Sequence, residues 1–197
     1  FAGFLPLLLA EYLSSRPKVV LDLEEALSQE AVHAVWRGGA ELAIVGENTA
    51  TEGLESFVCD IDELVLLVPA GHPLSRAGQV DIAELASIDL VGLSRATSLM
   101  RQIAAAAHAA GHTLRLRVQV RNFDAVCRIV SSGVGAAIVP RAAGAPHVRS
   151  MGLAQVRLTG IPTERRLLMV MRDRSRLSPE ALAFAALAQQ RMAGNRH

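Results

Sequence analysis

Three hydroxyl side chains lie close together near the middle of the sequence, at Ser94, Thr97 and Ser98. They follow an apolar stretch typical of a short strand, Leu90–Leu93, and precede an alanine-rich stretch typical of a helix. Neutral donors in front of a helix suit a carboxylate or another anion, because the helix N-terminus adds unpaired N–H groups and the positive end of a dipole. The alternative is a polar turn in contact with water, in which Arg95 is simply solvated rather than a source of charge for a ligand.

A general property of α/β proteins selects further candidate residues. Ligands bind beyond the carboxyl ends of the strands, where helices begin. Besides the 94–98 loop, the positions selected in this way are Ser28, Val45, Gly46, Asn122, Phe123, Val139 and Pro140. Ser28 and Asn122 also stand where helix N-caps are expected, so each is either a cap alone or a cap that also contacts a ligand. Phe123 either lines a pocket or packs in the core.

Helices and strands alternate along the chain and must position these loops. The expected helices cover about residues 4–14, 28–37, 99–110, 122–132 and 178–192, with a short one opened by the capping-box pattern of Asp81 and Glu84. The expected strands cover about residues 19–23, 41–45, 63–68, 90–93, 114–120, 136–140 and 165–171. Alternation through short loops predicts an α/β fold with parallel sheets covered on both faces.

Composition limits the classes of function. The chain has 197 residues, 51% of them hydrophobic, which suffices for one large or two small domains. The formal charge is +1 and no run of Lys or Arg is present, so we expect no DNA binding by this chain itself. The apolar run Phe4–Ala10 is too short to span a bilayer and lacks the features of a leader. We expect a cytoplasmic location without membrane contact; a leader removed ahead of Phe1 is the alternative.

The histidines do not form a catalytic or metal-binding pattern. His108 and His112 are four residues apart, but Gly111 intervenes where the helix is expected to end. Gly133-x-Gly135 lacks a third glycine and precedes a strand, which is the wrong context for a dinucleotide-binding loop. We therefore expect no enzyme activity, no metal site and no cofactor.

Two cysteines, Cys59 and Cys127, are too few for a disulfide scaffold or a four-ligand zinc site. The ordinary interpretation is that each is a small buried hydrophobic residue. A redox pair is the alternative, and a normal ligand response after both are changed to Ser would exclude it.

Several segments together resemble one family, the effector-binding domain of LysR-type transcriptional regulators. The matching segments are Arg16-Pro17, the strand Val19–Leu23, the helix end and strand Trp36–Val45, the strand and His-Pro-Leu turn of Leu67–Leu74, and the helix end, Gly-x-Gly and strand of Val130–Pro140. Each motif is short, and their order and spacing along the whole chain make the resemblance.

The resemblance implies a two-lobed fold of the type 2 periplasmic-binding-protein kind. Two strands would cross between the lobes, near Pro69 and near Glu164, and a ligand cleft would lie between the lobes. Lobe one is expected to contain residues 1–68 and 165–197, and lobe two residues 69–164. The family's first strand and its winged helix-turn-helix are expected to precede Phe1 in a longer protein.

The resemblance also implies a function. The expected effector is a small organic acid or a polar metabolite of similar size, bound by the loop residues selected above. A homodimer or higher homo-oligomer is implied, with the Phe4–Ser14 helix of one subunit near the Asn122–Ser132 helix of the other. DNA would be contacted only through the absent N-terminal domain. A periplasmic solute-binding protein of a transport system shares this fold and is the alternative.

Overall fold

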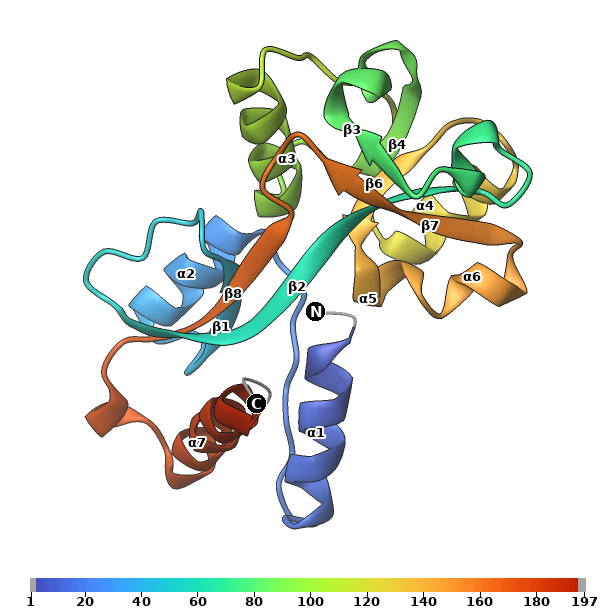
Figure 1. The fold of residues 1–197 in the computed structure, drawn as a ribbon. Helices are drawn as coiled ribbons and strands as arrows, with labels where there is room; N and C mark the ends of the chain where they lie inside the picture. The colour runs from blue at the N-terminus through green and yellow to red at the C-terminus, as the bar shows by residue number, and fades with distance from the viewer. Residues whose placement is uncertain (1–2, 195–197) are drawn as a thin grey trace. The chain divides into compact units, whose positions relative to one another are not determined.

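The computed structural model describes residues 3–194. By contacts, the chain divides into two compact units, residues 1–61 with 166–197 and residues 62–165. Two strands pass from one unit to the other, β2 (Glu55–Pro69) and β8 (Glu164–Met171), and both are visible in Figure 1. The first division therefore lies inside β2, earlier than the expected boundary after residue 68. Pro69 is the last residue of β2, and the expected lobes, residues 1–68 with 165–197 and residues 69–164, stay a prediction.

The first unit is a small sheet with three helices. Its elements are α1 (Phe4–Ser14), α2 (Ser28–Arg37), β1 (Ala43–Gly46), the first part of β2, most of β8, a 3-10 turn at Arg174–Arg176 and α7 (Pro179–Gly194). Strand β8 lies between β1 and β2, and β1 pairs with it in antiparallel register. The core contains Leu8, Tyr12, Met169 and Ala185, all fully buried. The ring of Tyr12 meets Phe184 edge-on at 5.1 Å, and its hydroxyl donates to the carbonyl of Glu180, so α1 and α7 are joined by packing and by a hydrogen bond.

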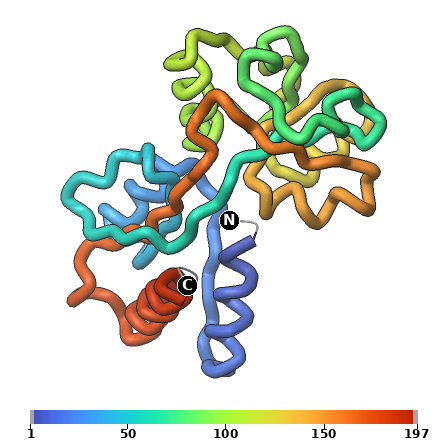
Figure 2. The backbone as a smooth tube through the Cα atoms, in the orientation of Figure 1, coloured from blue at the N-terminus to red at the C-terminus, as the bar shows by residue number. Residues whose placement is uncertain are grey.

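The expected strand Val19–Leu23 is not formed. The stretch is extended but has no strand partner among residues 3–194, and Figure 2 shows it as a nearly straight tube between α1 and α2. Val20 is 93% exposed and Leu23 is 65% exposed. The prediction from alternation was wrong for a physical reason: a strand exists only where a second strand accepts and donates its backbone hydrogen bonds.

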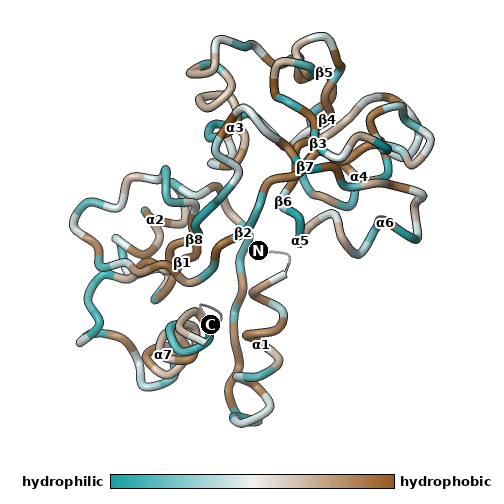
Figure 3. Tube along the Cα trace, viewed as in Figure 1, coloured by the Kyte–Doolittle hydropathy of each residue, from teal (hydrophilic) through white to brown (hydrophobic). Residues whose placement is uncertain are grey.

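The second unit has a mixed sheet and a parallel strand pair. Its elements are the rest of β2, β3 (Gln79–Asp81), β4 (Asp89–Leu93), α3 (Ser98–Ala109), β5 (Arg115–Val120), α4 (Phe123–Ser131), β6 (Ala137–Pro140), α5 (Arg141–Gly144), α6 (His147–Ser150) and β7 (Leu153–Thr159), with 3-10 turns at Pro73–Arg76 and Ile82–Ser87. The capping box of Asp81 and Glu84 is present, as expected. The strands in the middle of this unit are the hydrophobic, brown segments of Figure 3.

Strand β2 is the centre of this second unit. It pairs with β6 and β7 in antiparallel register, and β3 joins β7 in parallel. Leu64 to Val68 of β2 are all buried, which places them among the largest contributors to the core, at about 1.5–3 kcal/mol for each fully buried side chain. The sheets are therefore mixed and not parallel throughout, because the strands that pass between the units run against their neighbours.

Strands β4 and β5 form a separate parallel pair, as alternation predicted. Leu93 is opposite Val120 at the end of the pair, and Leu90 forms a parallel bridge with Ala136 on the other side. The carbonyl of Asp89 accepts the N–H of Ala136 at 3.0 Å. The strand order β5, β4 and then the segment leading into β6 follows from these contacts.

Gly135 is required where the segment leading into β6 passes β4. A Cβ atom on Gly135 would overlap the carbonyl oxygen of Asp89. We expect Gly135→Ala to lower the free energy of unfolding by about 1–3 kcal/mol, as overpacking against rigid backbone does. Equilibrium denaturant unfolding measures this loss.

Gly78→Ala is the matched control. Gly78 also lies in the second unit, and an added Cβ there has no atom within 4 Å. Equal losses for the two variants would show that the close approach at Gly135 is not what limits stability.

Candidate functional site

The polar loops of the second unit gather at one edge. Strands β4, β5 and β6 run in the same direction, so their carboxyl ends lie together. Helices α3, α4 and α5 begin directly after these three strands. The residues that the strand-end rule selected in this unit are therefore brought to one edge: Ser94, Thr97, Ser98, Asn122, Phe123, Val139 and Pro140.

Thr97 is the N-cap of α3, and its hydroxyl both accepts and donates a hydrogen bond within the protein. Its Oγ1 accepts the N–H of Met100 at 3.3 Å and donates to the carbonyl of Ser94 at 2.8 Å. Because its single proton is already donated, Thr97 has none to offer a ligand. The structure thus makes Thr97 a cap, which was not predicted from the sequence, and its contact with an effector stays a prediction.

Ser94 differs from Thr97 in its hydrogen bonds. Its Oγ accepts the N–H of Ala96 at 3.3 Å, and its residue is exposed, so the hydroxyl proton is available to a bound molecule. Ser98, the first residue of α3, is 5% exposed and belongs to the packed base of the loop. Of the three clustered hydroxyls, Ser94 is thus the one placed to donate outward.

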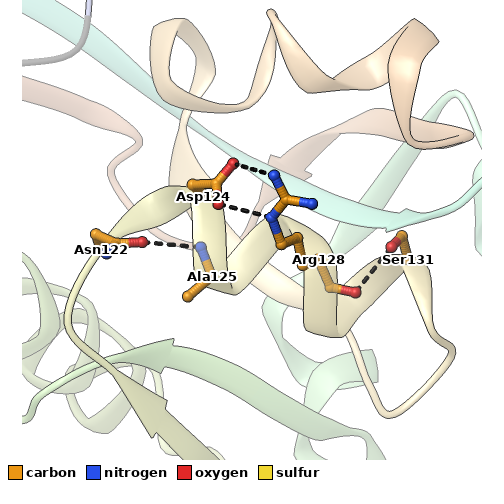
Figure 4. Close-up of polar contacts among 5 residues, drawn as sticks. All are labelled: Asn122, Asp124, Ala125, Arg128 and Ser131. Atoms are coloured by element: carbon orange, nitrogen blue, oxygen red, sulfur yellow. Dashed lines mark hydrogen bonds and ion pairs between the residues drawn. The ribbon is translucent and has the colours of Figure 1, made fainter.

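Asn122 caps α4 with one end of its amide and keeps the other end available. Its Oδ1 accepts the N–H of Ala125 at 2.9 Å, which leaves the amide N–H donors for a ligand (Figure 4). In the next turn, Arg128 binds Asp124 through Nε at 2.7 Å. That hydrogen bond holds the pKa of Asp124 below its ordinary value, so this carboxylate stays ionised and is compensated by Arg128. The expected cap is therefore confirmed at Asn122.

Some selected residues have side chains in the core. Val139 is 1% exposed and is opposite Val65 of β2, and Pro140 is buried opposite Leu64. Only their backbone groups are left to face a ligand. Phe123 is half-buried and packs against both core clusters of the unit, which agrees with the core interpretation for this ring.

In the first unit, Ser28 and Gly46 lie at the same end of a helix–strand hairpin. Helix α2 turns into β1 through Gly38, whose φ of 78° is the left-handed conformation that suits glycine, so the start of α2 and the end of β1 lie together. Val45 is fully buried, and the carbonyl of Gly46 accepts the N–H of Thr49 at 3.0 Å.

Ser28 is not the N-cap that its residue type suggests. The helix begins with Ser28 itself, and Leu27 occupies the cap position. The carboxylate of Glu30 reaches back to the N–H of Leu27 at 3.1 Å and supplies the capping bond, which shifts the helix start by one residue.

One known family covers almost the whole chain. The family model described as the LysR substrate binding domain matches residues 2–193. The chain belongs to the LysR substrate binding domain family. A curated relative, the "Probable RuBisCO transcriptional regulator" of Nostoc sp., is 25% identical over 187 residues, which cover 92% of this chain and 56% of the relative. The chain thus spans little more than half the length of that relative.

Solved structures share the fold of this LysR substrate binding domain. The regulatory domain of CcmR from Synechocystis, in complex with 2-PG, superposes with a TM-score of 0.84 at 18% identity and covers 94% of this chain and 90% of its own. The effector binding domain of QuiR, in complex with shikimate, gives a TM-score of 0.83 at 18% identity, covering 98% and 90%. The family and the α/β fold expected from the sequence motifs are confirmed, and the family match supports a regulator domain over a transport protein.

Two contacts within the LysR substrate binding domain were missed by sequence reasoning. Oε1 of Gln119 on β5 accepts the backbone N–H of Arg95 at 3.1 Å, and the guanidinium of Arg101 donates to the carbonyl of Ala96. Both hold the 94–97 loop. The available signal was Gln119 on the exposed side of an alternating strand, three residues before Asn122.

A third contact, at the same edge, is an ion pair. Arg141 at the start of α5 binds Glu63 with an Nη2–Oε2 distance of 2.8 Å, and both side chains are partly exposed. Glu63 is therefore compensated and does not present a bare carboxylate at this edge.

No group of three or more His, Cys, Asp or Glu side chains suited to a metal ion occurs in residues 3–194. Within the same residues, no helix is long and apolar enough to cross a membrane. These two findings concern only the described part of the LysR substrate binding domain.

The cysteines lie in different compact units, Cys59 in the first and Cys127 in the second, and both are buried. Burial raises the pKa of the Cys59 thiol to about 12, with a smaller effect from Asp60, and burial also raises the pKa of Cys127. Each thiol stays protonated near neutral pH, which makes it a poor nucleophile. Burial agrees with the ordinary interpretation of both residues.

The hydrogen bonds of Thr97 and Ser94 predict unequal effects of their substitution on stability. We expect Thr97→Val to lower the free energy of unfolding by about 1 kcal/mol, the usual cost of losing an N-cap. Ser94→Ala should change it by less than about 0.5 kcal/mol, as for an exposed side chain. Denaturant unfolding of the two variants checks this, and an equal loss in both would contradict the assignment of Thr97 as the structural hydroxyl.

Proposed function

We propose that this chain is the effector-sensing domain of a LysR-type transcriptional regulator and that its effector is a small organic anion. The observation on which this depends is the edge of the second unit, where the start of α3 and the start of α4 lie together with the outward donors of Ser94 and Asn122. Helix N-termini and neutral donors together stabilise a negative charge.

The charge balance of this edge supports an anionic ligand. Arg95 and Arg121 are exposed, and in the part of the chain that the structure describes neither guanidinium has an acidic partner. The nearby carboxylates of Asp124 and Glu63 are each bound by an arginine. An anion therefore meets uncompensated positive charge and little repulsion. The complexes of the CcmR and QuiR domains with 2-PG and shikimate are consistent with ligands of this class.

The proposed role is regulatory rather than enzymatic. An effector that binds one conformation of the domain more tightly than another shifts the population toward it, and no chemical step is needed. In the proposed protein this shift is transmitted in the cytoplasm to a separate DNA-binding domain. Ser28 and Gly46 remain predicted contacts in the first unit.

Thermal-shift and calorimetric titration with 2-phosphoglycolate, shikimate and a panel of small acids tests the effector class. We expect at least one acid to raise the melting temperature, because a ligand that binds the folded state stabilises it by mass action. Ser94→Ala should weaken the binding of that acid by about tenfold or more, the loss of one hydrogen bond to a charged group. Stabilisation by neutral or cationic metabolites and by no acid would overturn the proposal.

We also propose that the domain forms a homodimer through α1 and α4. Leu7 on α1 is 60% exposed and Leu13 is 36% exposed, so this helix has apolar surface that a second subunit would cover. The amphipathic helix α4 has the exposed residues Arg128 and Ser131 on its solvent side, which suits the polar rim of such a contact.

Leu7→Glu is expected to shift the chain from dimer toward monomer, measured by light scattering across micromolar concentrations. A charge placed in an apolar contact costs enough to weaken the dimer at least tenfold. Leu182→Glu on α7, at a leucine that is 40% exposed, is the control and should leave the dimer intact. A chain that is monomeric before any substitution would contradict the proposed pairing.

A further inference from the structure

The 94–97 loop is held in part by a side chain from a neighbouring strand. Gln119 is on the exposed side of β5, and its Oε1 accepts the N–H of Arg95 at 3.1 Å. We propose that Gln119 is a positioning residue for the effector: it fixes the loop that contains Ser94 relative to the loop that contains Asn122. This inference rests on the proposed function, since it concerns the same site.

The other contacts of the loop come from the loop itself or from the helix that follows it. The Ser94 carbonyl and hydroxyl accept hydrogen bonds from Thr97 and Ala96. Arg101, which binds the Ala96 carbonyl, is in α3. These bonds give the loop its shape but do not tie it to β5. Gln119 does, because it belongs to the strand that leads directly into Asn122.

The backbone pairing of β4 and β5 ends just before this contact. Gly92 is opposite Gln119 and Leu93 is opposite Val120, and no further pair follows. Arg95 lies two residues beyond the last paired residue of β4. The Gln119 side-chain amide thus accepts the hydrogen bond that a backbone carbonyl would accept if the strand pair continued. It extends the hydrogen bonding of the pair into the loop, which begins with the outward donor Ser94.

The chemistry of the amide also matters for an anion site. Gln119 accepts a hydrogen bond without adding negative charge, whereas a glutamate at this position would accept the same bond and place a carboxylate beside the loop. The structure therefore separates two properties of this position: the acceptor that holds the loop, and the neutral charge that leaves the site attractive to an anion.

Three variants test the inference with 2-phosphoglycolate as the titrated probe, or with shikimate where the screen selects it. Gln119→Met keeps the length of the side chain and removes the acceptor; we expect about three- to tenfold weaker binding with little change in melting temperature. Gln119→Glu keeps the acceptor but adds a carboxylate beside the loop, so it should also weaken binding of the anion although the loop is still held. Gln79→Met, at an exposed glutamine on β3 with no contact to the loop, is the matched control and should bind like the unaltered chain.

Amide hydrogen exchange of Arg95 reports the contact without any ligand. Exchange should be about fivefold faster in Gln119→Met, and as slow in Gln119→Glu as in the unaltered chain. In a double-mutant cycle, Gln119→Met should weaken binding much less when Ser94 is already Ala, because Gln119 acts through the placement of that hydroxyl.

The outcomes distinguish this inference from the proposed function. No binding of any acid by the unaltered chain overturns the proposed function and the positioning role with it. Binding that is unchanged by Gln119→Met, or an Arg95 amide that exchanges equally in all variants, overturns the positioning role alone. Full additivity of the Gln119 and Ser94 substitutions also overturns it, because two independent contacts would behave in that way.

Discussion

The parallel pairing of β4 with β5 is the constraint on which the candidate site depends. Helices α3 and α4 begin side by side only because the strands before them run in the same direction and end together. Asp89 anchors the other end of this pair: its carboxylate binds Arg115 and Arg117, at 2.7 and 2.6 Å, and its carbonyl binds the segment leading into β6. Asp89, at the start of β4, thus binds β5 on one side and the segment leading into β6 on the other. These strands in turn position the binding loops at their carboxyl ends.

Helix capping and ligand recognition draw on the same few polar groups at this edge. Thr97 caps α3 with its oxygen and gives its one proton to the Ser94 carbonyl, whereas Asn122 caps α4 with its oxygen and keeps its N–H groups. Both side chains cap with an oxygen; they differ because the Ser94 carbonyl already takes the proton of Thr97. Which donors remain for a ligand is therefore decided by the hydrogen bonds that each side chain already makes. The same bonds give the loop a defined shape before any ligand binds. Such preorganisation lowers the entropic cost of binding.

Much of the fold was predictable from local patterns. The helices at 28–37, 99–110 and 122–132, the parallel β4 and β5, and the caps at Asn122 and Asp81 follow from apolar periodicity, glycine stops and capping residues. Strand β7 was not predicted, and β2 is longer than its apolar run, because polar positions such as Glu55 and Asp60 become strand only through their neighbours. The loop residues were selected by a rule about strand ends, but the rule does not say which side chains face inward. Val139 and Pro140 are in the core because β6 pairs with β2, a contact distant in sequence.

The stretch between α1 and α2 has a consequence for handling the protein. Val19–Leu23 is extended and has no strand partner within residues 3–194, and Val20 and Leu23 face solvent. An extended segment without a strand partner is a template onto which another extended chain can add by backbone hydrogen bonding. It has one lysine before it and acidic residues after it, Lys18 and then Glu24 and Glu25, and flanking charges of this kind oppose self-association. Salt screens these charges, so a high ionic strength weakens their opposition to self-association at this segment.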